Sequence, residues 1–170
     1  RTATNIAARY CRRFYEVTFM ILTVDIGNTI IAVGGFEGDM LAFVVRLATT
    51  IKETSHEYAA KLDSILRLSD TETHSLTAAV ISSVVPQLTG TIREALKIAF
   101  GIDALSVGPG VKTGINIHCD DPSSVGADLI CVSVAAAKKY GSPCIIVDMG
   151  TATKIIHLGK NGTFEGVAIL

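Results

Sequence analysis

The sequence of 170 residues contains no tryptophan, four prolines and few charged side chains, which make up 18% of the chain. Lysine and arginine together number 15 and aspartate and glutamate 16, so the formal net charge is −1. This balance offers no general attraction to nucleic acid or to anionic membranes. No apolar run reaches the roughly 20 residues that a membrane span needs. We therefore expect no nucleic-acid partner and no membrane partner.

Several familiar site patterns are also missing. The P-loop pattern G-x-x-x-x-G-K-[ST] is absent, which excludes a P-loop ATPase at the level of motifs. The four histidines have no metal-binding partner at helical or hairpin spacing. The cysteines show no C-x-x-C spacing, so we expect reduced and mostly buried thiols in a cytoplasmic protein. They are Cys11, Cys119, Cys131 and Cys144.

Both ends of the chain look unusual. Residues 1–19 contain four arginines and a single acid, Glu16, without the apolar core of a signal peptide. We interpret this segment as a leader or non-native extension, and expect the native chain to begin at Met20; an organellar transit peptide is the alternative. The apolar run 167–170 resembles an unfinished strand, so we expect the chain to be truncated at its C-terminus.

Because 49% of the residues are hydrophobic, there is ample material for a core. The pattern predicts three strands close together, at 21–24, 30–33 and 41–47, as an antiparallel meander. A capping box, Thr54 with Glu57, predicts the start of a helix. Further expected elements follow in chain order. They are a buried strand at 78–81, a helix at 86–100, a short strand at 104–107, a helix at 121–140, and strands ending at 147 and spanning 154–158.

The turn between the first two expected strands, Asp25-Ile26-Gly27-Asn28-Thr29, has the composition of a phosphate-binding turn. Gly27 allows backbone N–H groups to approach an anion, Thr29 offers a hydroxyl, and Asp25 can hold a hydrated divalent cation. Taken alone, the pattern is more often that of an ordinary hairpin turn.

A second turn repeats the pattern. Residues 148–153, Asp-Met-Gly-Thr-Ala-Thr, also lie between two apolar runs. Two such turns in one chain predict two phosphate-binding loops that face each other across a cleft.

Two further segments are candidates for substrate binding. The glycine-rich loop 108–114 carries one cation, Lys112, which suits an anionic group; a plain connecting loop is an equal alternative. Asp128 lies at the start of a buried helix beside Gly126 and Ala127, which leave room for it. It is either an acid that stabilises the helix dipole or a general base for a substrate hydroxyl.

Taken together and in order, the motifs from Met20 onward resemble those of the type III pantothenate kinases. These enzymes belong to the acetate kinase/sugar kinase/Hsp70/actin superfamily. The matching segments are 25–29, 46–49 with 57–58, 82–86, 110–114, 121–128 and 148–153. The resemblance implies an α/β, actin-like ATPase (ribonuclease H-like) fold with one complete lobe and the beginning of a second. The first lobe would span residues 20–142 and the second would begin at residue 143.

The resemblance also implies a reaction, ATP-dependent phosphorylation of pantothenate to 4′-phosphopantothenate, the first step of coenzyme A biosynthesis. Members of the family use Mg²⁺ and a monovalent cation, K⁺ or NH₄⁺, and work as homodimers with pantothenate near the subunit interface. Asp128 would be the catalytic base, Asp25 would place Mg²⁺ through water, and Asp148 would hold the monovalent cation. The residues implied for ATP phosphates are Asp25, Gly27, Asn28, Thr29, Gly150, Thr151 and Thr153. Those implied for the substrate are Gly110, Lys112, Thr113, Gly114, Cys119 and Gly126.

The sequence departs from the family pattern at three positions. Ile30 replaces an expected Asn or Arg, Cys119 a common Tyr, and Leu129 a common Arg. Two other functions remain as hypotheses, namely a non-catalytic actin-like nucleotide-binding regulator and another small-molecule kinase of the same superfamily.

Overall fold

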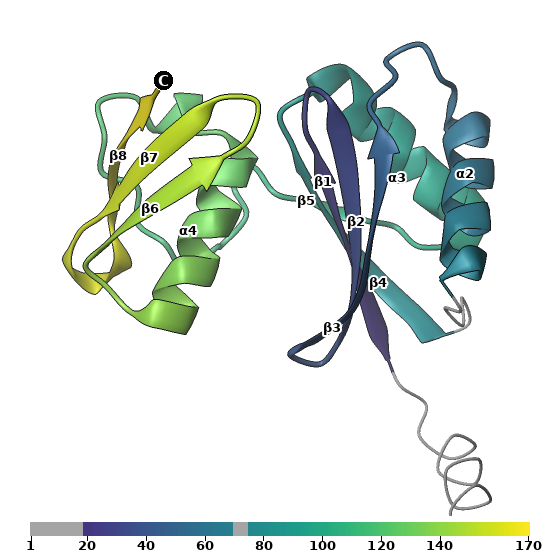
Figure 1. The fold of residues 1–170 in the computed structure, drawn as a ribbon, viewed down its shortest axis with the longest axis horizontal. Helices are drawn as coiled ribbons and strands as arrows, with labels where there is room; N and C mark the ends of the chain where they lie inside the picture. The colour runs from purple at the N-terminus through teal and green to yellow at the C-terminus, as the bar shows by residue number, and fades with distance from the viewer. Residues whose placement is uncertain (1–18, 70–74) are drawn as a thin grey trace, which may run out of the picture.

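The structure is a computed structural model that describes residues 19–69 and 75–170. It contains two sheets, each packed against helices, as Figure 1 shows. The proposed leader, apart from Phe19, lies outside the described residues, and so does Cys11.

The first sheet has five strands in the order β3-β2-β1-β4-β5. Two helices, one in each of the connections β3–β4 and β4–β5, complete this part of the fold. The elements are β1 (Met20–Ile26), β2 (Ile30–Glu37), β3 (Met40–Ala48), α2 (Ser55–Leu68), β4 (Leu76–Ser83), α3 (Pro86–Phe100) and β5 (Leu105–Ser106).

Strand directions identify the fold class. β2 pairs antiparallel with both β1 and β3, whereas β4 pairs parallel with β1 and with β5. Only β2 therefore runs against the other four strands. This is the α/β, ribonuclease H-like sheet of actin-like ATPases, and it confirms the fold and the antiparallel meander that the sequence predicted.

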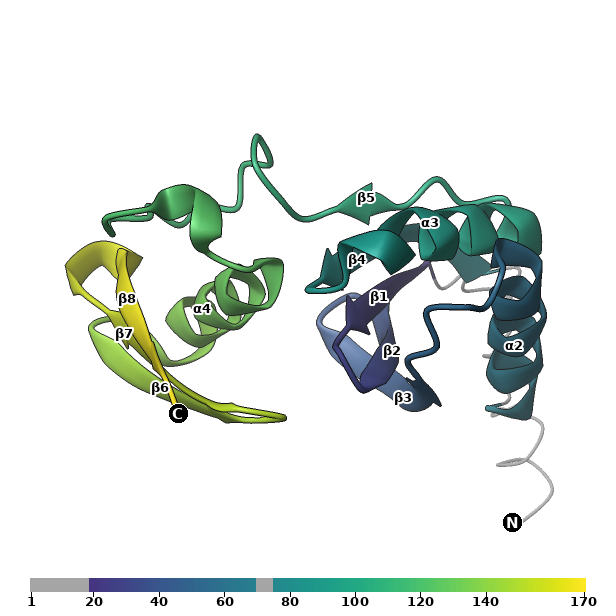
Figure 2. The ribbon, with the colours of Figure 1, turned by 90° about the horizontal axis from the view of Figure 1, so that it is seen from above.

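The alternation along β1 explains how the sheet presents polar groups. Leu22, Val24 and Ile26 are fully or almost fully buried and join the core formed with α2 and α3. Because successive strand residues point to opposite faces, Thr23 and Asp25 lie on the face away from these helices. Figure 2 shows α2 and α3 on one side of the sheet and α4 on the other.

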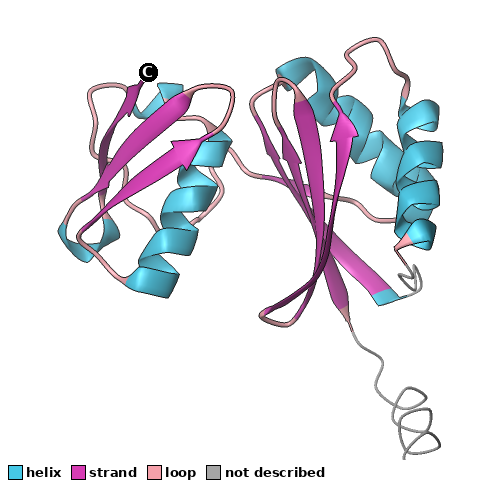
Figure 3. Cartoon of the chain, viewed as in Figure 1, coloured by secondary structure: helices cyan, strands magenta, loops and turns pink. Residues whose placement is uncertain are grey.

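The second sheet is an antiparallel three-stranded meander in the order β6-β7-β8. Its strands are β6 (Cys144–Met149), β7 (Thr153–Leu158) and β8 (Phe164–Ile169). Helix α4 (Ala127–Tyr140) packs against β6 and β7 and also contacts β4 of the first sheet. Figure 3 shows this helix alongside the second sheet. α4 therefore connects the two sheets physically.

Side-chain packing places α4 with the second sheet. Leu129 and Ala136 of α4 share a buried cluster with Ile156, Leu158 and Phe164. The outer face of β6 is different, because Ile145, Val147 and Met149 are 60%, 56% and 82% exposed. The proposed first lobe, residues 20–142, includes α4, although α4 packs with the second sheet. The boundary between residues 142 and 143 stays a proposal.

The expected helix over 121–140 is wrong at its start. The Asp121 side chain caps a short 3₁₀ helix, η2 (Pro122–Ser124), by accepting from the Ser123 N–H at 3.0 Å. Val125 then adopts an extended conformation with φ −73° and ψ 115°, and α4 begins only at Ala127. The cap at Asp121 and the proline that follows do begin a helical turn, as expected. That turn ends after Ser124, because Val125 is extended.

The capping box at the start of the first helix is confirmed. Thr54 and Glu57 form both hydrogen bonds of the capping box at the start of α2. The three cysteines among the described residues are free thiols: Cys119, Cys131 and Cys144. All three are partly exposed, so the expectation of mostly buried thiols is wrong for them. Across residues 19–69 and 75–170, the helices are all too short or too polar to traverse a bilayer.

Candidate active site

A pocket of about 360 Å³ lies where the first sheet meets α4 and the end of β6. We refer to it as the interlobe pocket. It is lined by Thr23, Val24, Asp25, Val80, Ser82, Asp128, Cys131, Val132 and Asp148. The three aspartates to which the resemblance gave separate roles therefore share one pocket.

Strand pairing and the start of α4 bring these carboxylates together. Asp25 lies near the carboxyl end of β1 and pairs in register with Ser82 of the parallel strand β4. Asp148 lies near the end of β6, and Asp128 lies in the first turn of α4. The carboxyl ends of neighbouring parallel strands are where α/β sheets usually bind ligands.

Gly126 leaves the space that the Asp128 carboxylate occupies. It is the N-cap residue of α4, with φ −63° and ψ 150°. A Cβ atom built at this position would stand 2.5 Å from Asp128 Oδ1. The expectation that Gly126 provides room beside Asp128 is confirmed, and any side chain at 126 must displace the carboxylate.

Lys154 connects two of the three carboxylates. Its Nζ donates to Asp128 Oδ2 at 2.5 Å and to Asp148 Oδ2 at 3.3 Å. The side chains of Lys154 and Asp128 are only 23% and 18% exposed. The hydrogen bond to Asp128, with smaller contributions from Asp148, raises the pKa of Lys154 even though burial lowers it. The ammonium group therefore stays charged in the pocket.

Asp25 has a raised pKa. Burial is the main cause, and the nearby charges of Asp128 and Asp148 add to it, while Ser82 and Lys154 act in the opposite direction. The Ser82 hydroxyl is buried and forms no hydrogen bond of regular geometry with the described residues. It is still close enough to Asp25 to lower the pKa of that carboxyl. This part of the pocket therefore disfavours an uncompensated negative charge and favours a bound cation.

Cys131 also lines the interlobe pocket, one helical turn after Asp128. Burial is the main cause that raises the pKa of its thiol, and the charges of Asp25 and Asp128 raise it further. Since the thiolate is the reactive form of cysteine, Cys131 is not an activated nucleophile here.

The first Asp-x-Gly turn is held by its neighbours. The N–H of Gly27 donates to the Ile30 carbonyl at 3.0 Å, and the Thr49 hydroxyl donates to the Gly27 carbonyl at 2.7 Å. The Thr49 N–H donates to the Thr29 carbonyl at 2.9 Å. Asn28 and Thr29 remain exposed in this turn and are free of the core.

The second turn is built in a similar way between β6 and β7. The Gly150 N–H donates to the Ala152 carbonyl at 3.3 Å, and Thr153 exchanges backbone hydrogen bonds with Leu170 at 2.9 and 3.2 Å. Gly150 and Thr151 are exposed. Both turns therefore present glycine and hydroxyl groups at the surface, within four residues of an aspartate of the interlobe pocket.

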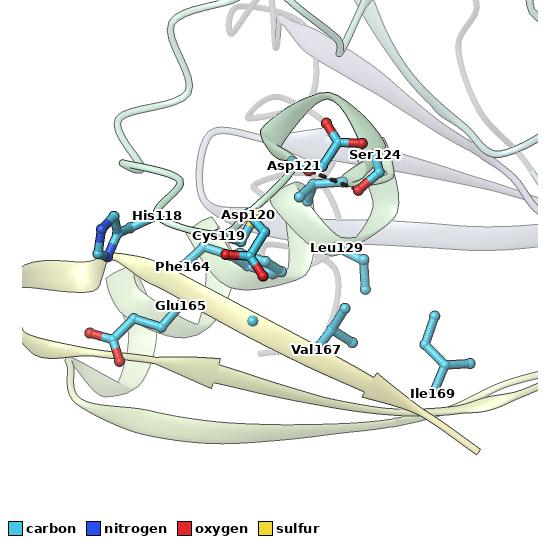
Figure 4. A pocket seen from close by; sticks show the side chains of 12 residues that line it. His118, Cys119, Asp120, Asp121, Ser124, Leu129, Phe164, Glu165, Val167 and Ile169 are labelled. Carbon is cyan, nitrogen blue, oxygen red and sulfur yellow. Dashed lines mark hydrogen bonds between the residues drawn. The ribbon is translucent and has the colours of Figure 1, made fainter.

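A second, more open hollow of about 740 Å³ lies beside β8 and contains Cys119. Figure 4 shows His118, Asp120 and Glu165 toward one end of it, and Leu129, Val167 and Ile169 toward the other. Cys119 and Leu129, two positions that depart from the family pattern, line this hollow and do not line the interlobe pocket.

The glycine-rich loop is separate from both hollows. Gly110 and Gly114 have φ values of 89° and 80°, which glycine adopts without strain. Gly110, Lys112, Thr113 and Gly114 line neither the interlobe pocket nor the hollow beside β8. Their role in substrate binding stays a prediction.

The donor set suits a divalent ion that keeps most of its water. Among the described residues, no three His, Cys, Asp or Glu side chains are grouped closely enough to hold a metal ion. Mg²⁺ is commonly held by one or two carboxylates together with substrate phosphates and water. Asp25, in surroundings that favour a cation, fits that mode.

Sequence reasoning did not identify Lys154. One signal was available, because the second turn places residues 148 and 154 opposite each other across the β6–β7 hairpin. An opposite-charge pair at such positions is a common cross-strand contact. The approach of Lys154 to Asp128, 26 residues away in sequence, depends on how α4 packs and has no sequence signal.

Residues 21–170 match the family model described as type III pantothenate kinase. The chain is 42% identical over 151 residues to the type III pantothenate kinase of Shouchella clausii, and 41% identical over 150 residues to that of Geobacter sulfurreducens. Each alignment covers 88% of this chain and 59% of the relative, so the chain spans somewhat more than half the length of these relatives.

Among solved structures, a reductive activator for a corrinoid, iron–sulfur protein aligns with a TM-score of 0.52 at 13% identity. The alignment covers 91% of this chain and 31% of that one, and it speaks for the fold alone. The family model and the relatives at about 40% identity go further. The chain belongs to the type III pantothenate kinase family.

Proposed function

We propose that the intact protein carrying this sequence transfers the γ-phosphoryl group of ATP to pantothenate and produces 4′-phosphopantothenate and ADP. This would be the first step of coenzyme A biosynthesis. The observation that carries the proposal, beyond family membership, is the convergence of Asp25, Asp128 and Asp148 on one pocket between the two sheets. Phosphoryl transfer relies on positioning and on charge neutralisation, and such a pocket can supply both.

Asp128 is the proposed general base. The oxygen of the pantothenate hydroxyl attacks the γ-phosphorus, the bond to the ADP oxygen breaks, and the hydroxyl proton passes to the Asp128 carboxylate. Asp128 is fixed at the start of α4 and its Oδ2 is bonded to Lys154. Its Oδ1 lies in the space beside Gly126 and is our candidate to accept the proton.

The nucleotide phosphates are proposed to lie between the two Asp-x-Gly turns. The exposed Asn28, Thr29 and Thr151 support this, because hydroxyl and amide groups near glycine turns bind phosphate oxygens. Asp25 would hold Mg²⁺ through water, and the ion would supply positive charge against the charge that develops on the phosphates.

The pantothenate chain is proposed to run along the segment that leads into α4. Cys119 and Gly126 lie on this segment, and Lys112 of the preceding loop offers a charge for the pantothenate carboxylate. The proposed setting is a cytoplasmic homodimer, as in the family that the chain resembles.

The test is pantothenate-dependent ADP release by the intact protein in the presence of Mg²⁺. Asp128→Asn should lower kcat by about 10²- to 10⁴-fold, the range that general-base catalysis contributes, while ATP binding measured by calorimetry persists. Asp103→Asn, on an exposed loop residue, is the matched control and should keep wild-type turnover. ATP binding without any pantothenate turnover in the wild type would favour a non-catalytic regulator instead.

A further inference from the structure

The position of Lys154 disagrees with one expectation carried by the family resemblance. That expectation places a monovalent cation, K⁺ or NH₄⁺, at Asp148. In the structure the Asp148 carboxylate already accepts from the Lys154 ammonium group, with Nζ 3.3 Å from Oδ2. A second cation on this oxygen would lie within a few ångströms of a like charge.

The donor atom itself is chemically suited to replace such an ion. A lysine ammonium is a compact monovalent cation with three N–H donors, in effect NH₄⁺ with one hydrogen replaced by a carbon stem. Lys154 directs its donors to Asp128 at 2.5 Å and Asp148 at 3.3 Å. It therefore supplies one positive charge that is shared by two carboxylates of the interlobe pocket, with the shorter contact to Asp128.

This contact differs from an ordinary surface ion pair. Exposed pairs contribute little because water screens them, and the pair between Lys138 and Asp39, with side chains 77% and 95% exposed, is an example. The side chains of Lys154 and Asp128 are 23% and 18% exposed, and that of Asp148 is 40% exposed. The strand register holds Lys154 opposite Asp148, so the backbone places the charge.

We propose that the Lys154 ammonium group takes the place of the monovalent cation at Asp148, so that the protein works without K⁺ or NH₄⁺. The tethered charge is present at a fixed local concentration and does not depend on the salt in solution. Lys154 is a positioning residue in this proposal, because it holds the proposed base Asp128 and the carboxylate of Asp148 in place. The inference rests on the proposed kinase function.

The first measurement needs no variant. Pantothenate-dependent ADP release by the intact protein is compared in tetramethylammonium, potassium and ammonium chloride at equal ionic strength. We expect the same rate in all three salts. A wild-type protein that turns over only with K⁺ or NH₄⁺ would overturn the inference and leave the proposed kinase function intact.

Variants then test whether the charge of Lys154 is the reason. Lys154→Met should lower the rate in tetramethylammonium chloride by about 10²-fold, the usual cost of losing one preorganised electrostatic contact. Adding K⁺ or NH₄⁺ should then raise the rate of this variant by about tenfold or more. Lys154→Arg, which keeps the charge, should remain independent of the salt. Lys138→Met is the matched control and should behave as the wild type.

Rescue by an added cation separates this role from a merely structural one. A folded Lys154→Met protein that keeps the full rate without K⁺, or that K⁺ does not rescue, would overturn the inference. If the Met variant fails to fold, salt independence of the wild type and of Lys154→Arg still decides the question.

Calorimetric titration with ATP and Mg²⁺ gives a second readout that does not require turnover. We expect ATP affinity to be equal in tetramethylammonium and potassium chloride for the wild type, and to become K⁺-dependent in Lys154→Met. A protein with no pantothenate turnover but with this pattern would refute the proposed function and retain the inference. Failure to bind ATP in either salt would overturn both.

Discussion

Asp25 illustrates how one residue can favour ligand binding at the expense of stability. Burial and the neighbouring Asp128 and Asp148 raise the pKa of its carboxyl. The native state therefore binds this proton more tightly than the unfolded chain does, and the ionised form is disfavoured in the fold. The surroundings that suit a cation are the same surroundings that destabilise the bare carboxylate.

Asp25→Asn should therefore make the protein more stable at neutral pH and inactive. With a raised native pKa, the contribution of Asp25 to stability is fully present below the unfolded pKa of about 3.9 and is lost as the pH rises through the native value. Replacing the carboxylate removes this loss, so the gain should appear at pH 7.5 and vanish in acid. Urea unfolding at both pH values measures it, with the exposed Asp103→Asn as control. Lower stability of the variant at pH 7.5 would contradict the sign.

At the level of elements, the start of α4 decides where the proposed base lies. The extended Val125 and the N-cap Gly126 end the 3₁₀ turn and begin the helix. Asp128 falls in the first helical turn as a result, with its carboxylate directed into the interlobe pocket. A helix continuous from Asp121 would have placed Asp128 in its second turn.

Gly126→Ala should impair catalysis with little effect on stability. The φ and ψ angles at 126 are accessible to alanine, so the free energy of unfolding should change by less than about 1 kcal/mol. The new Cβ would meet Asp128 Oδ1 at 2.5 Å and must move the carboxylate, which should lower kcat by about 10²-fold. Steady-state kinetics and thermal unfolding measure the two effects.

The control for this prediction is Gly90→Ala in α3. No atom lies within 4 Å of a Cβ built at Gly90, and this exposed helical glycine should stabilise the protein by about 0.5–1 kcal/mol when replaced. Its kcat should equal that of the wild type. Unchanged kcat in Gly126→Ala would mean that the carboxylate tolerates the displacement.

At the scale of the whole molecule, two separate hydrophobic clusters support one pocket. Leu62 belongs to the cluster of the first sheet with α2 and α3, and Phe164 to the cluster of the second sheet with α4. Both side chains are almost completely buried, at 0% and 1% exposure. The pocket aspartates are drawn from elements of both clusters, so its geometry depends on how the two parts meet.

Truncating either core should loosen mainly its own part of the molecule. Leu62→Ala should cost about 2–5 kcal/mol and Phe164→Ala about 3–5 kcal/mol. In hydrogen exchange of the intact protein, Leu62→Ala should raise exchange in β1–β5, and Phe164→Ala in α4 and β6–β8. Each variant serves as the control of the other, and equal acceleration throughout the chain in both would show a single cooperative unit.

Local signals in the sequence were sufficient for most of the elements. The capping box of Thr54 and Glu57 acts within four residues, and the alternation along β1 follows from the strand period, so both could be predicted. The break at Val125 could not, because Asp121 followed by proline begins a 3₁₀ turn and a longer helix equally well. The roles implied for the loop 110–114 and for Cys119 remain predictions.

The sequence by itself determined the order of the strands and helices, the two Asp-x-Gly turns and the family, because these depend on periodicity, turn chemistry and motif order. Only the tertiary structure brought Asp25, Asp128 and Asp148 to one pocket and placed the Lys154 ammonium group between two of them. The reason is physical: contacts between residues far apart in sequence depend on how α4 packs between two sheets, and no local pattern encodes that packing.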